Sequence, residues 1–149
     1  AGPRVSVPKL EEFGHTIPMS VRWGDMDMLG HVNNVQYFRY AESGRIAYFE
    51  AFEKSDPTFW KEHGIIMAGI GCDFLAQVHY PAELVVASRI SRMGRSSAEM
   101  RQAVFQDGKA VAALRGTIVW FDYRSNSTLP IPAHAREWIR AREVVAPEE

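Results

Sequence analysis

The chain has 149 residues, of which 46% are hydrophobic and 23% charged, and its 17 Lys and Arg nearly balance 18 Asp and Glu, for a formal net charge of -1. This length and composition are typical of one globular domain whose core needs neither disulfides nor a structural metal, so we expect residues 1–149 to form a single domain. The near-neutral charge excludes a general nucleic-acid binder, which needs a basic face, and no apolar run approaches the ~18 residues that span a membrane.

Residues 1–15 carry no hydrophobic periodicity, which predicts a loosely attached arm. They also lack the basic start and continuous apolar stretch of a secretory signal. The one cysteine, Cys72, cannot form an internal disulfide and falls in an apolar segment. We therefore expect a packed thiol and a reducing, cytoplasmic compartment.

A strand is predicted directly after the arm. Apolar and polar residues alternate from Thr16 to Trp23, and Gly24 ends the pattern. A period of two indicates a strand with one buried face. The residues expected on that face are Ile17, Met19, Val21 and Trp23.

A long amphipathic helix follows. It is predicted to begin at Asn33 or Asn34, because a short side-chain oxygen favours the N-cap, and to end near Lys54. Glu42 and Arg45 project into its apolar arc three residues apart, so we expect them to form a partly buried ion pair. The arc itself is predicted to contain Val35, Phe38, Ala41, Ile46, Phe49 and Phe52.

The rest of the chain is rich in strand-forming residues. At most a short helix is predicted over residues 58–63, with Gly64 as its C-cap. Asp107-Gly108 is a hairpin signal, and a last helix is predicted over residues 133–143. This order predicts an α+β fold, a long helix on a mostly antiparallel sheet of about five strands. The strands after the helix are predicted at 65–78, 84–93, 97–106 and 109–122.

The connection between the first strand and the long helix, VRWGDMDMLGHVNN at residues 21–34, concentrates polar groups suited to chemistry. Amides at a helix N-terminus point outward with partial positive charge and can hold a developing oxyanion. A thioester suits such a site, because its thiol leaving group has a pKa of about 8.5, like that of cysteine, and needs no strong general acid. A carboxylate and amide donors are then sufficient.

Other motifs were weighed for this segment. An EF-hand loop starting at Asp25 fails at Leu29 and Gln36, where oxygen ligands belong. An Asp-x-Asp phosphatase would need a buried strand before the pair and a doubly wound sheet. A metal site of Asp25, Asp27 and His31 stays an alternative, although the other four histidines show no ligand spacing. We expect no metal and no cofactor.

A family resemblance becomes specific over this segment. The run RWGDMDMLGHVNNxxYFxYxExxR, from Arg22 to Arg45, resembles the signature of hotdog-fold acyl-CoA thioesterases of the 4-hydroxybenzoyl-CoA thioesterase-like group. The similarity continues through DFL at 73–75, YPA at 80–82, GRSS at 94–97 and the strand end at 119–122. It covers residues from Ile17 to near Trp138.

The resemblance implies a sheet wrapped around a central helix, in subunits that pair edge to edge into a homodimer or stack into a homotetramer, with active sites between subunits. It implies hydrolysis of an acyl-CoA, with Asp27 as general base or nucleophile and coenzyme A entering only as part of the substrate. The helix start at Asn34 and Val35 falls where the family holds the thioester oxygen. His31 and Asn33 shape the loop and can hydrogen-bond to the carboxylate or to water.

Substrate-binding residues are expected outside the loop as well. By resemblance, Gly71 or its neighbours line the acyl pocket from the facing subunit. Arg89, Arg92 and Arg95 form the one concentrated basic stretch and could bind the phosphates of coenzyme A. The alternative for these arginines is a solvated edge strand protected by charge.

Two other functions stay open at this stage. One is a non-catalytic protein that binds acyl thioesters on the same fold. The other is a hydratase or dehydratase, whose relatives on this fold use an Asp and a His five residues apart around Asn-Pro. Here Asp27 and His31 are four residues apart with no Asn-Pro between them, which disfavours that chemistry.

Overall fold

The computed structural model describes residues 7–149, and its core is one antiparallel sheet. The strand order is β1-β3-β4-β5-β2, with a short β6 paired to β5, and every neighbouring pair is antiparallel. The predicted α+β class is confirmed. The strands are β1 (His15–Ser20), β2 (His63–Phe74), β3 (Glu83–Met93), β4 (Ser97–Gln106), β5 (Lys109–Asp122) and β6 (Ser127–Thr128).

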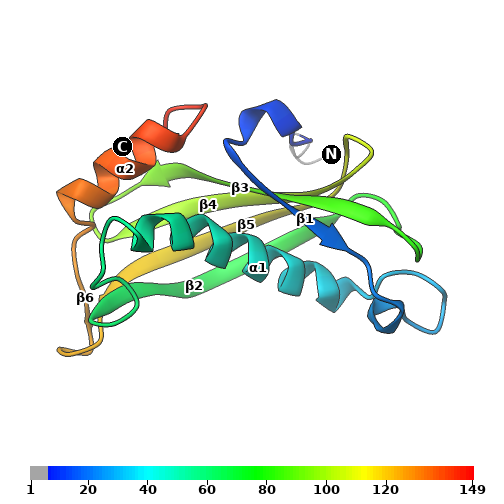
Figure 1. Ribbon diagram of the computed structural model, residues 1–149, viewed down its shortest axis with the longest axis horizontal. Helices are drawn as coiled ribbons and strands as arrows, with labels where there is room; N and C mark the ends of the chain where they lie inside the picture. Colours follow the sequence, from blue (N-terminus) through cyan, green and yellow to red (C-terminus); the bar gives the residue numbers. More distant parts are fainter. Residues whose placement is uncertain (1–6) are drawn as a thin grey trace, which may run out of the picture.

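Within residues 7–149, two α-helices accompany the sheet. The long helix α1 (Asn34–Glu53) lies along one face of the curved sheet, and α2 (Ala133–Arg142) lies beside one end of it (Figure 1). Gly44 permits the close approach of α1, since a Cβ there would come within 2.7 Å of Val86 on β3. Within residues 7–149, neither helix is long and apolar enough to cross a membrane.

The predicted bounds of α1 are confirmed, and its predicted buried face is confirmed in part: Ala41, Phe49 and Phe52 are buried and Phe38 is half-buried, but the other two residues face solvent. Val35 and Ile46 are 57% and 41% exposed. Tyrosines take the buried positions because their hydroxyl groups find carboxylate partners there: Tyr40 donates to Asp25 and Tyr48 donates to Glu143. The buried residues are Tyr37, Tyr40, Ala41, Gly44, Tyr48, Phe49 and Phe52.

The ion pair predicted between Glu42 and Arg45 is wrong. Glu42 is exposed to solvent, and the Arg45 guanidinium donates instead to Oε1 of Gln102 at 3.3 Å. Gln102 in turn donates to the carbonyl of Ala41 at 2.7 Å, which ties α1 to β4. A sheet residue therefore replaces the expected partner on the helix.

The first strand and the arm also differ from prediction. β1 ends at Ser20, and Trp23, expected to be buried, lies in a 3-10 turn with 77% of its surface exposed. Residues 1–6 of the predicted arm lie outside the described residues. The remainder is attached rather than loose, because Phe13 is buried against Ala103 and Phe105 of the sheet.

The predicted short helix at 58–63 is wrong as well. Residues 54–62 form turns, in which the Asp56 carboxylate accepts from the Thr58 amide, and Trp60 has a positive φ of 72°. Gly64 belongs to β2 rather than to a helix cap, since a Cβ there would overlap the Tyr123 hydroxyl.

The later elements follow the sequence closely. β4 and β5 have the predicted ends, while β3 begins one residue early and α2 ends one residue early. β6 was not predicted. β2 ends at Phe74 instead of Val78, because residues 77–82 turn away to contact the first loop: the amides of Val32 and Val21 donate to the carbonyls of Val78 and Ala82.

Candidate active site

The loop between β1 and α1 turns its first carboxylate inward. Asp25 is only 5% exposed, and its Oδ2 accepts from the Tyr40 hydroxyl at 2.7 Å and from the Arg22 amide at 2.9 Å. Burial, together with the hydrogen bond to Asp25, raises the pKa of Tyr40 well above its ordinary value. Asp25 thus holds the loop to α1 through Oδ2, while its Oδ1 lies 3.7 Å from Nε of Arg22.

The second carboxylate points outward. Asp27 is exposed, and its Oδ1 accepts from the amides of Leu29 at 2.9 Å and His31 at 3.2 Å. The loop closes through two further bonds, from the Asp27 amide to the His31 carbonyl and from the Gly30 amide to the Asp27 carbonyl. Gly30 permits this turn with its φ of 82°. In residues 7–149 no partner is recorded for Oδ2, which leaves that oxygen available for chemistry.

The start of α1 supplies the backbone amides that were expected to bind the thioester oxygen. Asn33 caps the helix, with its Oδ1 accepting from the Val35 amide at 3.0 Å. Its carbonyl accepts from the Gln36 amide, and its own amide donates to the backbone carbonyl of Asp25. Of the two amides predicted to hold an oxyanion, that of Val35 is therefore occupied. The Asn34 amide has no acceptor among the described residues, so it is the one able to bind an oxygen of a ligand.

A cavity of about 420 Å³ brings these groups together. Three of the residues expected at the site, Asp27, His31 and Asn34, line it, and the end of β2 supplies an apolar wall. Asn33 acts on this site only through its cap on the Val35 amide. The lining residues are Asp27, Leu29, His31, Val32, Asn34, Tyr37, Phe74, Leu75, Ala76 and Gln77.

One residue that supports this site was missed at the sequence level. His79 donates from Nδ1 to the Gly30 carbonyl at 3.0 Å, and its ring contacts the ring of His31 edge to face, with centroids 4.9 Å apart. Only a carbonyl faces Nδ1, so this nitrogen carries the proton. The contact joins residues 49 positions apart, and no local spacing could have revealed it.

Other expected site residues lie elsewhere. Gly71 and Arg89 line a second cavity, on the opposite face of the sheet from α1. Arg92 and Arg95 are exposed and are absent from that lining. The structure therefore does not gather the three predicted arginines into one site. Within residues 7–149 no three His, Cys, Asp or Glu side chains are arranged to hold a metal ion.

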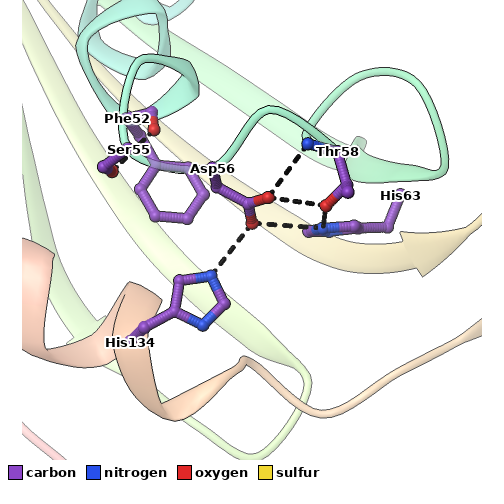
Figure 2. Close-up of polar contacts among 6 residues, drawn as sticks. All are labelled: Phe52, Ser55, Asp56, Thr58, His63 and His134. Atoms are coloured by element: carbon purple, nitrogen blue, oxygen red, sulfur yellow. Dashed lines mark hydrogen bonds and ion pairs between the residues drawn. The ribbon is translucent and has the colours of Figure 1, made fainter.

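A second polar cluster, far from the loop, is built around Asp56 (Figure 2). Oδ1 accepts from the amide and hydroxyl of Thr58, while Oδ2 lies 2.9 Å from Nε2 of His134 and 3.3 Å from Nε2 of His63. Burial alone would raise the pKa of Asp56, but the hydrogen bonds from Thr58 and His134, together with nearby His63, lower it to about 2. The cluster ties the first turn of α2 to the start of β2.

Comparison with known proteins decides the family. Residues 21–139 match the thioesterase-like superfamily. The chain belongs to that superfamily. It is 38% identical over 79 residues to the uncharacterised protein YsmA of Bacillus subtilis, a match that covers 53% of this chain and only about half, 52%, of that relative. It is 26% identical over 127 residues to the chloroplastic acyl-acyl carrier protein thioesterase ATL2 of Arabidopsis thaliana, covering 83% of this chain and 67% of the relative.

Solved structures agree with this assignment. The thioesterase-like chain superposes on the PA5185 protein of Pseudomonas aeruginosa with a TM-score of 0.82 and 29% identity, covering 97% of this chain and all of that one (100%). It also superposes on a thioesterase of Thermus thermophilus, solved with coenzyme A and Zn, with a TM-score of 0.77 and 32% identity over 90% of this chain and 97% of that chain. The family and its fold support thioester hydrolysis in general.

Proposed function

We propose that this thioesterase-like chain hydrolyses acyl-CoA thioesters, with Asp27 as general base or nucleophile and the Asn34 amide as the oxyanion donor. One observation carries the proposal: among residues 7–149, one cavity presents an exposed carboxylate with one oxygen free of partners and a helix N-terminal amide without an acceptor. His31 lines the same cavity and holds the loop through its backbone.

The chemistry follows from these two groups. The thioester carbonyl oxygen accepts from the Asn34 amide, where the partial positive charge of the helix N-terminus favours the developing negative charge. Asp27 takes a proton from a water molecule whose oxygen bonds to the carbonyl carbon, or its own oxygen attacks that carbon to give an anhydride that water then cleaves. In either route the C–S bond breaks and the thiolate leaves with its electron pair.

Coenzyme A is the carrier we propose. The Thermus thermophilus relative was solved with coenzyme A, whereas the Arabidopsis thaliana relative is named for acyl carrier protein substrates. Acyl carrier protein is therefore the alternative carrier. The two are distinguished by comparing kcat/KM for the same acyl chain on each carrier.

We also propose that the chain works as a homodimer or a homotetramer. β2 lies at an edge of the sheet, and Ile66, Ile70 and Phe74 are exposed along it. An edge strand with free amides and apolar side chains favours pairing with a second copy. Phe74 lines the cavity of Asp27, so such pairing would complete its wall. A cytoplasmic location stays a prediction from the sequence.

The test is thiol release from short, medium, long and aromatic acyl-CoAs. Turnover of at least one member is expected, and the panel then identifies the acyl group. Binding of these compounds without thiol release would contradict the enzyme proposal and favour an acyl-thioester binding protein. A change in double-bond absorbance without free thiol would instead favour the hydratase or dehydratase.

A further inference from the structure

One of the three buried tyrosines of α1 differs from the other two. The hydroxyl of Tyr40 donates to Asp25 at 2.7 Å, and that of Tyr48 donates to Glu143 at 2.5 Å. Tyr37 is only 2% exposed, yet among the described residues its hydroxyl has no hydrogen-bond partner. A buried hydroxyl without a partner costs free energy that a phenylalanine ring would not cost. Packing alone therefore does not account for the Tyr37 hydroxyl.

Tyr37 belongs to the wall of the Asp27 cavity. Its ring contacts the ring of Phe74, which lines the same cavity, with centroids 5.7 Å apart. The Tyr37 hydroxyl is not one of the side-chain atoms of residues 7–149 that are sealed from solvent without a partner, so it reaches open space. The cavity supplies that space. A ligand in the cavity can therefore provide the partner that the protein does not.

The surroundings of Tyr37 are apolar and keep its hydroxyl protonated. Tyr37 packs in a cluster with Val32 and Leu114, and Cys72 packs against the same cluster. Burial, and to a smaller extent nearby Cys72, raises the pKa of Tyr37. The hydroxyl therefore keeps its proton at neutral pH and can donate it to a ligand oxygen. A polar group in an otherwise apolar wall orients a ligand and determines which ligands fit.

The place of Tyr37 on α1 indicates which part of the ligand it meets. Asn34, whose amide is the proposed oxyanion donor, lies three residues earlier, which is ~4.5 Å along the helix axis and on nearly the same face. Only a few carbon–carbon bonds are needed to span that separation. We propose that Tyr37 selects acyl groups that carry a hydroxyl or oxo oxygen near the thioester carbonyl, an inference that rests on the function proposed above.

The experiment compares kcat/KM of thiol release for butanoyl-CoA, 3-hydroxybutanoyl-CoA and 3-oxobutanoyl-CoA. We expect wild type to prefer at least one oxygenated compound over butanoyl-CoA by at least tenfold, because an unsubstituted chain leaves the Tyr37 hydroxyl unpaired. Tyr37→Phe, which removes only the hydroxyl, should lose this preference. Tyr123→Phe is the matched control at a tyrosine that is 43% exposed just after β5, and it should keep the preference.

Two kinetic outcomes would overturn the proposal: equal kcat/KM for all three compounds in wild type, or an unchanged preference in Tyr37→Phe. If none of the compounds releases thiol, hydrolysis of these substrates fails instead. Titration calorimetry with the same compounds then tests Tyr37 by itself. The preference should appear in the dissociation constants of wild type and be lost in Tyr37→Phe, and its absence from wild type would overturn the proposal.

Stability gives a readout that needs no ligand. Urea denaturation should show Tyr37→Phe to be at least as stable as wild type, because the hydroxyl it loses has no partner in the protein. Tyr40→Phe should be less stable than wild type, because it loses the hydrogen bond to Asp25. A Tyr37→Phe variant as destabilised as Tyr40→Phe would show that the hydroxyl already has a partner within the protein, and would contradict a role in binding a ligand.

Discussion

Asp27 and Asp56 are two carboxylates with opposite surroundings. Asp56 is 7% exposed, and both of its oxygens are engaged by Thr58 and two histidines. Asp27 is exposed beside a cavity, and one oxygen is held by loop amides while the other has no partner among the described residues. A carboxylate with partners on both oxygens contributes to stability. A carboxylate that is fixed through one oxygen and has the other oxygen free can react.

The largest expected effect is on catalysis at Asp27. Asp27→Asn is nearly isosteric and keeps an oxygen for the loop amides, but it cannot act as a base. We expect kcat for thiol release to fall on the order of a hundredfold or more, with little change in the free energy of unfolding. Asp107→Asn, in an exposed hairpin turn, is the matched control and should keep wild-type kcat. A loss of less than tenfold would remove Asp27 from the chemistry.

Asp56→Asn should show the reverse behaviour. The change removes charge-assisted hydrogen bonds to Thr58 and His134 in a buried setting, so we expect a loss of about 2 kcal/mol in the free energy of unfolding. Urea denaturation measures this loss. The folded variant should retain kcat, since α2 and β2 join at a distance from the loop of Asp27.

The Asp56 cluster also predicts an acid dependence. Its pKa is lowered from 3.8 to about 2 by folding, so its contribution to stability is present above pH 3.8 and is lost as the pH falls toward 2. That contribution is about 2 kcal/mol by linkage. Urea titrations between pH 5 and pH 3 should show the gap between wild type and Asp56→Asn narrowing as the pH falls. A constant gap would contradict the lowered pKa.

Local sequence patterns predicted the parts of the fold that depend on neighbours in the chain. The Asn33 cap predicted the start of α1, and Asp107-Gly108 with strand periodicity predicted β4 and β5. The buried face of α1 was predicted only in part, because Tyr40 and Tyr48 are buried there with carboxylate partners outside the helix. A helix cap, a hairpin turn and a hydrophobic period depend on residues close together in the chain. A buried tyrosine hydroxyl depends on a hydrogen-bond partner far away in the chain.

The same distinction applies to the site. Asp27, His31 and Asn34 lie within eight residues of one another, so their meeting in one cavity followed from the loop itself. His79 and the Asp56 cluster did not, because His79 reaches Gly30 across 49 positions and His134 reaches Asp56 across 78. Likewise Arg89, Arg101 and Arg115 meet through strand register, while the predicted stretch of arginines was chosen by proximity in sequence.

The Asn33 cap gives a further test of a residue that acts on stability rather than on catalysis. Asn33→Ala removes the bond to the Val35 amide, so we expect a loss of about 1 kcal/mol in the free energy of unfolding. Asn33→Ser should restore most of it, because serine is an equally good cap. Urea denaturation of both variants measures the difference, and equal losses would contradict a capping role.

The smallest expected effect is at His79. His79→Phe keeps a ring against His31 but loses the donor to the Gly30 carbonyl, so kcat should fall about threefold with KM unchanged, in line with one net hydrogen bond. His79→Asn keeps a donor and should retain kcat. Steady-state kinetics on both variants separates the donor from the ring, and equal kcat values would show that the bond does not position the loop.

The most direct test of the division between the two carboxylates measures kcat and the free energy of unfolding for Asp27→Asn and Asp56→Asn in one experiment. Thiol release is corrected for the folded fraction of each variant. The structure predicts that Asp27→Asn loses activity while it keeps its stability, and that Asp56→Asn loses stability while it keeps its activity. Equal losses of activity in the two variants, or a fully active Asp27→Asn, would contradict the assignment of chemistry to Asp27.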